Sequence, residues 1–368
     1  MSKRVTCRAL MISAPASGQG KTTVTAALAF YFRQQGKKVR VFKTGPDFID
    51  PMILQHASKQ PVHQLDLWMV GESECRKRLA EAAEVSDLIL IEGVMGLFDG
   101  NPSSADLAEM FGIPVLAIID SKGMAQTFGA VAHGLVNYRP SLKFAGVLAN
   151  RVASANHAEM LAESLPENAG SLRYMVKDEN LAFPSRHLGL YQASEIESLD
   201  EILQTAAKAL HVPSLDVLAP EVEFIFPESE MPEQDISVLQ RLKSTRIGIA
   251  KDEAFSFIYA ANIECLEKMG AEIHYFSPMH DTVLPELDSL WFPGGYPELY
   301  AQELAGNQPM KQAISDHFEA DKPILAECGG MLYLNETLQT LNEENNSDND
   351  SQKYIMVGLL PGQAIMQP

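Results

Sequence analysis

Two residues near the start of the chain have the types and spacing for phosphate chemistry: Lys21 and Thr22, which follow glycines at positions 18 and 20. Glycine lets the backbone point several N–H groups at one anion, and the positive end of a following helix favours phosphate there. The lysine of such a loop reaches the terminal phosphates, and the hydroxyl binds Mg²⁺. Proline stands at position 15, where the G-x-x-x-x-G-K-S/T pattern has its first glycine. We expect a nucleotide triphosphate to bind Gly18, Gly20, Lys21, Thr22 and Thr23.

Charged side chains follow two later β-rich runs. Lys43, Asp47 and Asp50 surround a Gly-Pro turn after residues 38–42, and Glu92 follows the apolar run 87–91. Such a cluster is also common in solvated turns, but ligands of α/β sheets bind at the carboxyl ends of strands. A carboxylate directly after a buried strand is placed to hold a metal or its water. Asn150 ends a further strand and could hydrogen-bond a nucleobase.

A cysteine in the second half has the surroundings of a nucleophile. Cys328 lies between an apolar run and Gly329-Gly330, which is typical of a strand-to-helix elbow that exposes a thiolate. Upstream, Gly294 and Gly295 could turn backbone N–H groups toward an oxyanion. A buried structural cysteine is the alternative. No histidine follows Cys328, the last being His317.

The elements that must position these residues alternate between strand and helix. Strands are predicted at 9–12, 38–42, 86–91, 114–120 and 144–151, with helices at 24–32 and 125–137, a pattern that favours a doubly wound parallel sheet. Prolines and glutamates over 211–244 indicate a linker. A second α/β unit then has strands at 246–250, 272–276 and 289–292. We expect a mobile loop at 342–353 and a last strand at 354–360. The expected domains are 1–210 and 245–368.

The amino-acid composition and net charge of the chain restrict the kinds of molecule that it can bind. The chain has 368 residues, 46% of them hydrophobic, and a net charge of −19, which argues against nucleic acid and anionic membranes. No apolar run is long enough to span a bilayer, so we expect a cytoplasmic protein. The four cysteines lack C-x-x-C spacing, so their pattern indicates neither a zinc site nor a disulfide framework.

Six motifs together resemble the cobyrinic acid a,c-diamide synthase family of cobalamin biosynthesis over nearly the whole chain. They are SAPASGQGKTT, KTGPDFIDP, EGVMGLFDG, KDEAFSFIYAANIECLEKMGAE, FPGGYPELYA and AECGGMLYL. The resemblance implies a P-loop α/β synthetase domain followed by an α/β class I glutamine amidotransferase-like domain. The implied reaction is ATP-dependent amidation of the a and c carboxylates of cobyrinate through acyl phosphates, with ammonia released from glutamine.

The resemblance also implies a role for each matching residue. Lys21 would stabilise charge on the migrating phosphoryl group, and Lys43 would neutralise the incoming carboxylate. Mg²⁺ would be held by Thr22, Asp47 and Glu92, while Asp50 and Asp99 would orient the corrin substrate or ammonia. In the second domain Cys328 would attack glutamine beside the backbone of Gly294 and Gly295.

Family members carry a catalytic histidine beyond the position of Pro368, so we expect a truncated glutaminase domain that hydrolyses glutamine poorly, while free ammonia could feed the synthetase. Four alternatives stay open: hydrogenobyrinate as the substrate, a cobyric acid synthase-like amidase, a P-loop ATPase switch, and a degenerate fragment without glutaminase activity. Such a switch has a second lysine where this chain has Ala16, and it has no use for a cysteine elbow. A homodimer is also left open.

Overall fold

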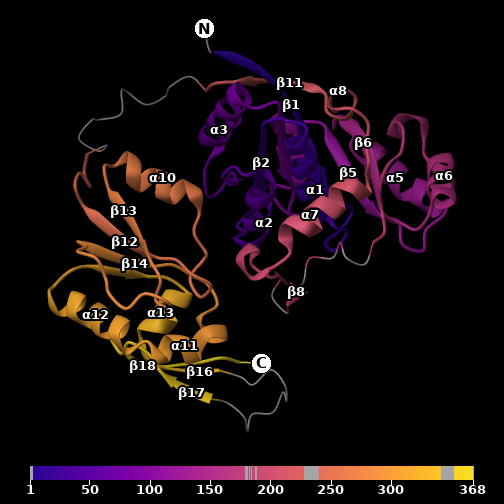
Figure 1. Cartoon of the computed structure of the whole chain (residues 1–368). Helices are drawn as coiled ribbons and strands as arrows, with labels where there is room; N and C mark the ends of the chain where they lie inside the picture. The colour runs from indigo at the N-terminus through magenta and orange to yellow at the C-terminus, as the bar shows by residue number, and fades with distance from the viewer. Residues whose placement is uncertain are drawn as a thin grey trace. The chain divides into compact units, whose positions relative to one another are not determined.

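The computed structural model describes residues 3–178, 181, 183, 185–186, 189–227, 240–340 and 352–367. The chain divides into two compact units, Met1–Glu230 and Met231–Pro368. Each unit is considered separately, and both are drawn in Figure 1.

The first unit alternates strands and helices along most of its length. Its elements are β1 (Arg4–Ser13), α1 (Lys21–Gln34), β2 (Val39–Thr44), α2 (Ile49–Ser58), β3 (His63–Leu65), α3 (Glu72–Val85), β4 (Leu88–Glu92), α4 (Ser104–Met110), β5 (Val115–Asp120), α5 (Thr127–Tyr138), β6 (Phe144–Val152), α6 (Ala155–Ser164), η1 (Glu167–Ala169), β7 (Arg173–Val176), β8 (Ser185–Arg186), β9 (Gly189–Leu190), η3 (Ala193–Glu195), α7 (Leu199–Ala209), β10 (Leu210–His211), α8 (Leu215–Leu218) and β11 (Glu221–Ile225).

Most described strands of this unit form one large sheet in the order β10-β7-β6-β5-β1-β4-β2-β3, with β11 paired to β1, and β8 and β9 form a separate antiparallel pair. The pairs from β3 to β7 are parallel, whereas β10 and β11 run antiparallel to their partners. The carboxyl ends of the parallel strands therefore meet at one edge. This edge carries the phosphate loop, Lys43, Glu92 and Asn150.

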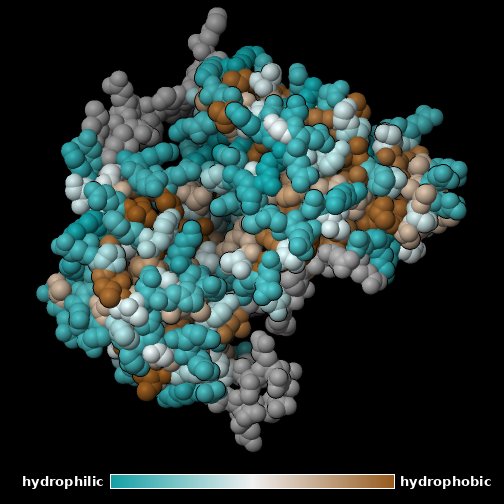
Figure 2. Space-filling view, in the orientation of Figure 1, coloured by the Kyte–Doolittle hydropathy of each residue, from teal (hydrophilic) through white to brown (hydrophobic). Residues whose placement is uncertain are grey.

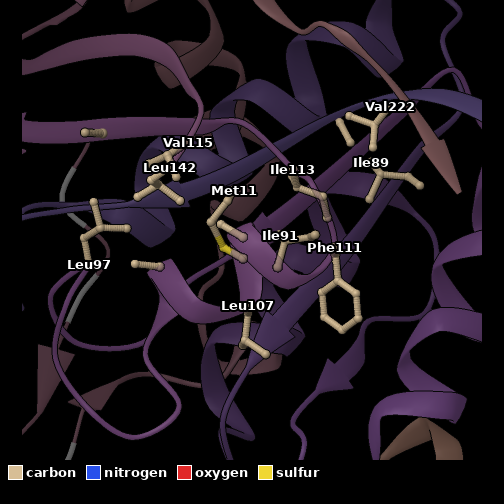
Figure 3. Close-up of a cluster of buried hydrophobic side chains, with 14 of the residues drawn as sticks. Met11, Ile89, Ile91, Leu97, Leu107, Phe111, Ile113, Val115, Leu142 and Val222 are labelled. Carbon is tan, nitrogen blue, oxygen red and sulfur yellow. The ribbon is translucent and has the colours of Figure 1, made fainter. Parts of the chain in front are cut away.

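Both faces of the sheet are covered, which is why its central strands are apolar throughout. In β1, Ala9 and Met11 pack into one hydrophobic cluster with residues of α3, α4, α5 and α6. Leu10 and Ile12 pack into the opposite cluster with residues of α1, α2 and α7. Figure 3 shows part of the first cluster around Met11 and Ile91. Burying each aliphatic side chain of this size contributes roughly 1.5–3 kcal/mol.

The second unit holds a smaller parallel sheet in the order β13-β12-β14-β15 and a separate sheet in the order β17-β16-β18. Its described elements are β12 (Arg246–Ala250), α10 (Ala260–Lys268), β13 (Glu272–Phe276), β14 (Ser289–Phe292), η4 (Pro297–Tyr300), α11 (Ala301–Gly306), α12 (Gln308–Glu319), β15 (Ile324–Ala326), α13 (Gly329–Leu334), β16 (Asn335–Thr340), β17 (Gln352–Ile355) and β18 (Leu360–Ile365). The α/β class predicted from the sequence is confirmed in both units.

Two segments differ from the sequence-based expectation. The first part of the expected linker instead contributes β10, α8 and β11 to the first unit, because Val222 and Phe224 alternate with exposed residues and pack against the sheet. Residues 228–239 of that linker lie outside the described residues. The prediction of a single last strand at 354–360 is wrong. Instead, β17 ends at Ile355 and β18 starts at Leu360. The two strands are separate because Gly358, with φ 83°, turns the chain between them. The predicted loop at 342–353 falls largely on residues that are not described.

Across the described residues, no helix is both long enough and apolar enough to cross a membrane. On the face shown in Figure 2, hydrophilic residues cover much of the first unit, in keeping with its many charged side chains.

Candidate active site

The phosphate loop connects β1 to α1 and depends on two glycines in the left-handed region. Gly18 has φ 78° and Gly20 has φ 89°. A Cβ at Gly20 would collide with the side-chain amide of Asn150, whereas Gly18 has open space around it. Position 20 therefore requires glycine for two reasons, its left-handed backbone conformation and the close approach of the Asn150 side chain.

Asn150, at the end of β6, holds this loop in place. Its Nδ2 donates to the carbonyl of Gln19 at 2.9 Å, and its Oδ1 accepts the N–H of Arg151 at 2.9 Å. The Gln19 side chain in turn accepts the N–H of Asp120 at 2.8 Å, at the end of β5. The Asn150 amide already makes hydrogen bonds that position the phosphate loop. Its contact with a nucleobase stays a prediction.

Lys21, the first residue of α1, folds back over the loop. Its Nζ donates to the carbonyl oxygens of Met95 at 2.5 Å and Ala16 at 3.3 Å. Burial lowers the pKa of Lys21, with Glu92 acting in the opposite direction. Both acceptors are neutral, so the ammonium charge is free to interact with an anion in the cavity.

Lys43, near the end of β2, lies among three carboxylates. Its Nζ is 2.6 Å from Asp50 Oδ2, 2.7 Å from Glu92 Oε1 and 3.3 Å from Asp47 Oδ2. The lysine side chain is only 3% exposed. Burial alone would lower the pKa of Lys43, but the carboxylates, Glu92 foremost, hold this pKa well above its usual value. The ammonium ion is therefore charged at any pH at which the protein works.

Glu92, the last residue of β4, is completely buried. Its Oε1 accepts hydrogen bonds from Lys43 and from Thr22 Oγ1, the latter at 3.0 Å. Its Oε2 has no hydrogen-bond partner among the described residues. Burial raises the pKa of Glu92 and outweighs the neighbouring lysine. An unpaired buried carboxylate oxygen beside a threonine hydroxyl suits Mg²⁺, which prefers oxygen ligands.

Asp47 and Asp50 lie on the connection from β2 to α2 and differ in their surroundings. Asp47 Oδ1 accepts the backbone N–H groups of Ile49 at 2.9 Å and of Asp50 at 3.2 Å, which forms a tight turn. Burial, followed by the charge of Asp50, raises the pKa of Asp47. Burial would also raise the pKa of Asp50, but contact with Lys43 keeps it below its usual value.

The loop after β4 carries Asp99, and this residue is engaged within the loop. Its Oδ2 accepts the N–H of Gly96 at 3.1 Å. A Cβ at Gly96 would collide with Asp99 and lie 2.7 Å from the carbonyl oxygen of Pro15. Leu97 N donates to Ala14 O at 2.7 Å, which ties the same loop to the phosphate loop.

The first unit contains a cavity of about 500 Å³ beside the phosphate loop. Most of the residues predicted for the synthetase site line this cavity, but Asn150 and Asp99 do not. Arg151 and Phe183 also line the cavity, and neither residue was predicted from the sequence. Arg151 has φ 59° and pairs with Asp120 at 2.5 Å, and its position next to Asn150 at a strand end was a usable signal. The lining consists of Ser17, Gly18, Gly20, Lys21, Thr22, Thr23, Lys43, Asp47, Asp50, Glu92, Gly93, Val94, Met95, Arg151 and Phe183.

The second unit places Cys328 on a sharp turn between β15 and α13. The cysteine is exposed and has φ 46°, a strained conformation for a residue with a side chain. Gly330 follows, where a Cβ would collide with the carbonyl of Phe292. A Cβ added at Gly294 would lie 3.4 Å from the Cβ of Cys328, so the glycine loop and the thiol are neighbours.

No hydrogen bond joins a histidine to Cys328 in the part of this unit that the structure describes. His280 pairs with Glu253 at 3.0 Å, and His317 is buried in α12.

Two family models match the chain, one for each unit. Residues 10–190 match the CobQ/CobB/MinD/ParA nucleotide binding domain, and residues 246–368 match the CobB/CobQ-like glutamine amidotransferase domain. The most similar relatives include a hydrogenobyrinate a,c-diamide synthase of Stutzerimonas stutzeri, 55% identical over 98% of this chain and 81% of that protein. The chain belongs to the a,c-diamide synthase family of glutamine-dependent corrinoid amidotransferases.

Two further relatives bear the family's two substrate names. The hydrogenobyrinate a,c-diamide synthase of Pseudomonas aeruginosa is 53% identical over 98% of this chain and 80% of its own length. The cobyrinate a,c-diamide synthase of Herminiimonas arsenicoxydans is 47% identical over 98% of this chain and 79% of its own length. The family predicted from the motifs is confirmed, and its nucleotide-binding and amidotransferase domains both lie in this chain.

Proposed function

We propose that this chain amidates the a and c carboxylates of a corrin substrate, cobyrinate or hydrogenobyrinate, using ATP and nitrogen from glutamine or ammonia. The observation that carries this proposal is the ammonium group of Lys43, which lies in the wall of the phosphate-loop cavity. A cation at this position supports the proposal, because a substrate carboxylate that approaches a nucleotide needs positive charge near it.

The nucleotide is bound by the loop from Gly18 to Thr23. Lys21 is oriented by the carbonyl oxygens of Ala16 and Met95 and neutralises charge on the terminal phosphate. Thr22, Glu92 and Asp47 are the residues that would hold Mg²⁺, with the unpaired Oε2 of Glu92 the best available ligand. When bound, Mg²⁺ would neutralise phosphate charge and align the phosphates for transfer.

The carboxylate of the substrate is activated by phosphoryl transfer. A carboxylate oxygen of the corrin side chain attacks the terminal phosphorus, the bond to the bridging oxygen breaks, and ADP leaves. Ammonia then attacks the acyl carbon, phosphate departs, and the nitrogen loses a proton to give the amide. Lys43 lowers the repulsion between two anions in the first step. It is already held in place by Asp50 and Glu92, so this alignment needs no rearrangement of the lysine.

The second unit is the proposed source of nitrogen from glutamine, and we expect this half-reaction to be slow because no histidine is hydrogen-bonded to Cys328 among the described residues. The Cys328 thiolate attacks the carboxamide carbon of glutamine, while backbone N–H groups of the Gly294-Gly295 loop stabilise the oxyanion. The C–N bond then breaks, the nitrogen takes a proton from water and leaves as ammonia, and water hydrolyses the thioester to glutamate and the free thiol. Free ammonia bypasses this unit. Comparing ammonium with glutamine as the nitrogen source therefore tests the first unit and the second unit separately.

The test is product identity. Purified chain is incubated with Mg-ATP and either cobyrinate or hydrogenobyrinate, first with ammonium and then with glutamine, and products are analysed by mass spectrometry and NMR. We expect two amides, at the a and c positions, with ammonium as the nitrogen source, and Cys328→Ala should leave this reaction unchanged. Amidation at other side chains would contradict the proposal, as would ATP turnover that is independent of both corrinoids.

A further inference from the structure

The turn that follows β12 is organised by a single carboxylate. Oδ1 of Asp252 accepts the backbone N–H groups of Ala254 at 2.9 Å and Phe255 at 3.1 Å. Oδ2 accepts Ser277 Oγ at 2.8 Å and the N–H of Met279 at 3.0 Å. One side chain thus joins the turn after β12 to the segment after β13.

The same turn is hydrogen-bonded to the glycine loop after β14. The carbonyl oxygen of Gly294 accepts the N–H groups of Ser256 at 3.1 Å and Phe257 at 3.0 Å. Next to it, Gly295 packs so closely on the turn that a Cβ there would collide with the carbonyl of Ala254. The position of this glycine loop therefore depends on the conformation of the turn.

The glycine loop in turn contacts the cysteine elbow. A Cβ added at Gly294 would lie 3.3 Å from the Cβ of Phe257 on one side and 3.4 Å from the Cβ of Cys328 on the other. The backbone of the elbow is attached to the start of the same loop, since Gly330 N donates to Pro293 O at 3.0 Å. A continuous set of contacts thus leads from Asp252 to the elbow that carries the thiol.

We propose that Asp252 is a positioning residue for Cys328, which it serves by fixing the turn that holds Gly294 and Gly295 beside the thiol. This inference rests on the proposed glutaminase role of the second unit. Asp252 does not touch the reacting atoms in this proposal. It determines how well a carboxamide carbon and its developing oxyanion are aligned with the sulfur and the backbone N–H groups.

A purely structural role for Asp252 is the competing explanation, because a half-buried carboxylate with four donors also stabilises the unit. Loss of stability alone changes the environment of buried side chains of the second unit such as Trp291. Loss of alignment affects Cys328 specifically. Cys265 is exposed in the same unit and is the natural internal reference, whereas Cys7 and Cys75 are buried in the first unit.

The experiment uses the full chain and the glutamine analogue 6-diazo-5-oxo-L-norleucine, with labelling of each cysteine followed by mass spectrometry. Asp252→Asn keeps the shape of the side chain but replaces one acceptor oxygen by a donor. We expect its maximal rate of Cys328 labelling to fall by about tenfold or more, with a smaller change in the half-saturating concentration. Ser277→Ala removes one donor and leaves both bonds from the turn, so its effect should be weaker.

The matched control is Glu253→Gln, which removes the neighbouring carboxylate and its exposed contact with His280. This variant should label Cys328 like the unchanged chain. Fluorescence of Trp291, which is buried in the second unit, should be equal in all variants and shows that the unit is folded. Iodoacetamide labelling of the exposed Cys265 should also be equal and corrects for the reactivity of the reagent. The inference is overturned if Asp252→Asn and Ser277→Ala label Cys328 at the unchanged rate, or if slower labelling of Cys328 is accompanied by a change in the Trp291 signal. If the unchanged chain itself is not labelled at Cys328, the proposed glutaminase role fails instead.

Discussion

Lys43 on β2 and Glu92 on β4 are direct register partners in neighbouring parallel strands, and their side chains meet at 2.7 Å. The two residues point to the same side at the carboxyl edge of the sheet. The cation of the proposed carboxylate site and the buried oxygen of the proposed metal site are therefore placed by a single strand pairing. In the proposed mechanism, activation of a carboxylate and binding of the nucleotide are coupled at this point.

Replacing Lys43 should damage both stability and activity. Lys43→Met leaves Glu92 and Asp50 as buried charges without their partner, which costs about 3–5 kcal/mol in the free energy of unfolding. The double variant Lys43→Met/Glu92→Gln should recover part of this loss, because the two residues are coupled. Urea denaturation of Lys43→Met, Glu92→Gln and the double variant measures the coupling. Lys37→Met, at an exposed position, serves as the control. A loss in the double variant that equals the sum of the two single losses would disprove the coupling.

Gly20→Ala should weaken nucleotide binding. The new methyl group would collide with Asn150 and would be held at a positive φ, so the phosphate loop must shift. We expect an affinity for ATP lower by about tenfold or more, measured by calorimetry. Gly36→Ala is the matched control, because Gly36 has a similar φ of 78° and open space around it. A loss of affinity that is equal in the two variants would show that backbone strain alone matters.

Much of this arrangement could be predicted from the sequence, because apolar runs and glycine-rich motifs are local signals. The strands and the residues at their carboxyl ends were found in this way. The pairing of Lys43 with Glu92 was not predictable, since it depends on β4 lying between β1 and β2. The role of Asn150 as a support for Gln19 and the return of β11 to the sheet also depend on contacts between distant segments.

The hydroxyl of Thr22 should matter only when Mg²⁺ is present. Chelation with EDTA should weaken ATP binding by the unchanged chain, whereas Thr22→Ala should bind ATP weakly in both conditions. We expect the difference in the presence of Mg²⁺ to be about tenfold or more. Thr205→Ala, which removes an exposed hydroxyl from α7, should respond to EDTA like the unchanged chain. An unaltered Mg²⁺ effect in Thr22→Ala would remove this residue from the metal site.

The loop that carries Asp99 ends in a helix cap whose strength depends on pH. Hydrogen bonds from Ser103, chiefly from its hydroxyl, hold the pKa of Asp106 at about 2. The folded-state pKa is depressed, so this carboxylate stabilises the fold above the unfolded value of about 3.9. That stability is lost as pH falls toward 2.

Asp106 is partly exposed, so solvent screening reduces the contribution of its charge. Asp106→Asn should therefore cost no more than about 1 kcal/mol in the free energy of unfolding at neutral pH, and the difference from the unchanged chain should shrink between about pH 4 and pH 2. Urea unfolding at a series of pH values measures this difference. Glu81→Gln, at an exposed carboxylate, is the reference. A difference that stays constant down to pH 2 would contradict the assignment.

The central claim is that the phosphate loop delivers phosphate to a carboxylate and not to water. The most direct measurement uses corrin substrate whose carboxylates are labelled with heavy oxygen, in unlabelled water, with ammonium and Mg-ATP. The account predicts that each amide formed is accompanied by one labelled oxygen in the inorganic phosphate, detected by phosphorus NMR or mass spectrometry. Phosphate that carries no label while amide accumulates would contradict it.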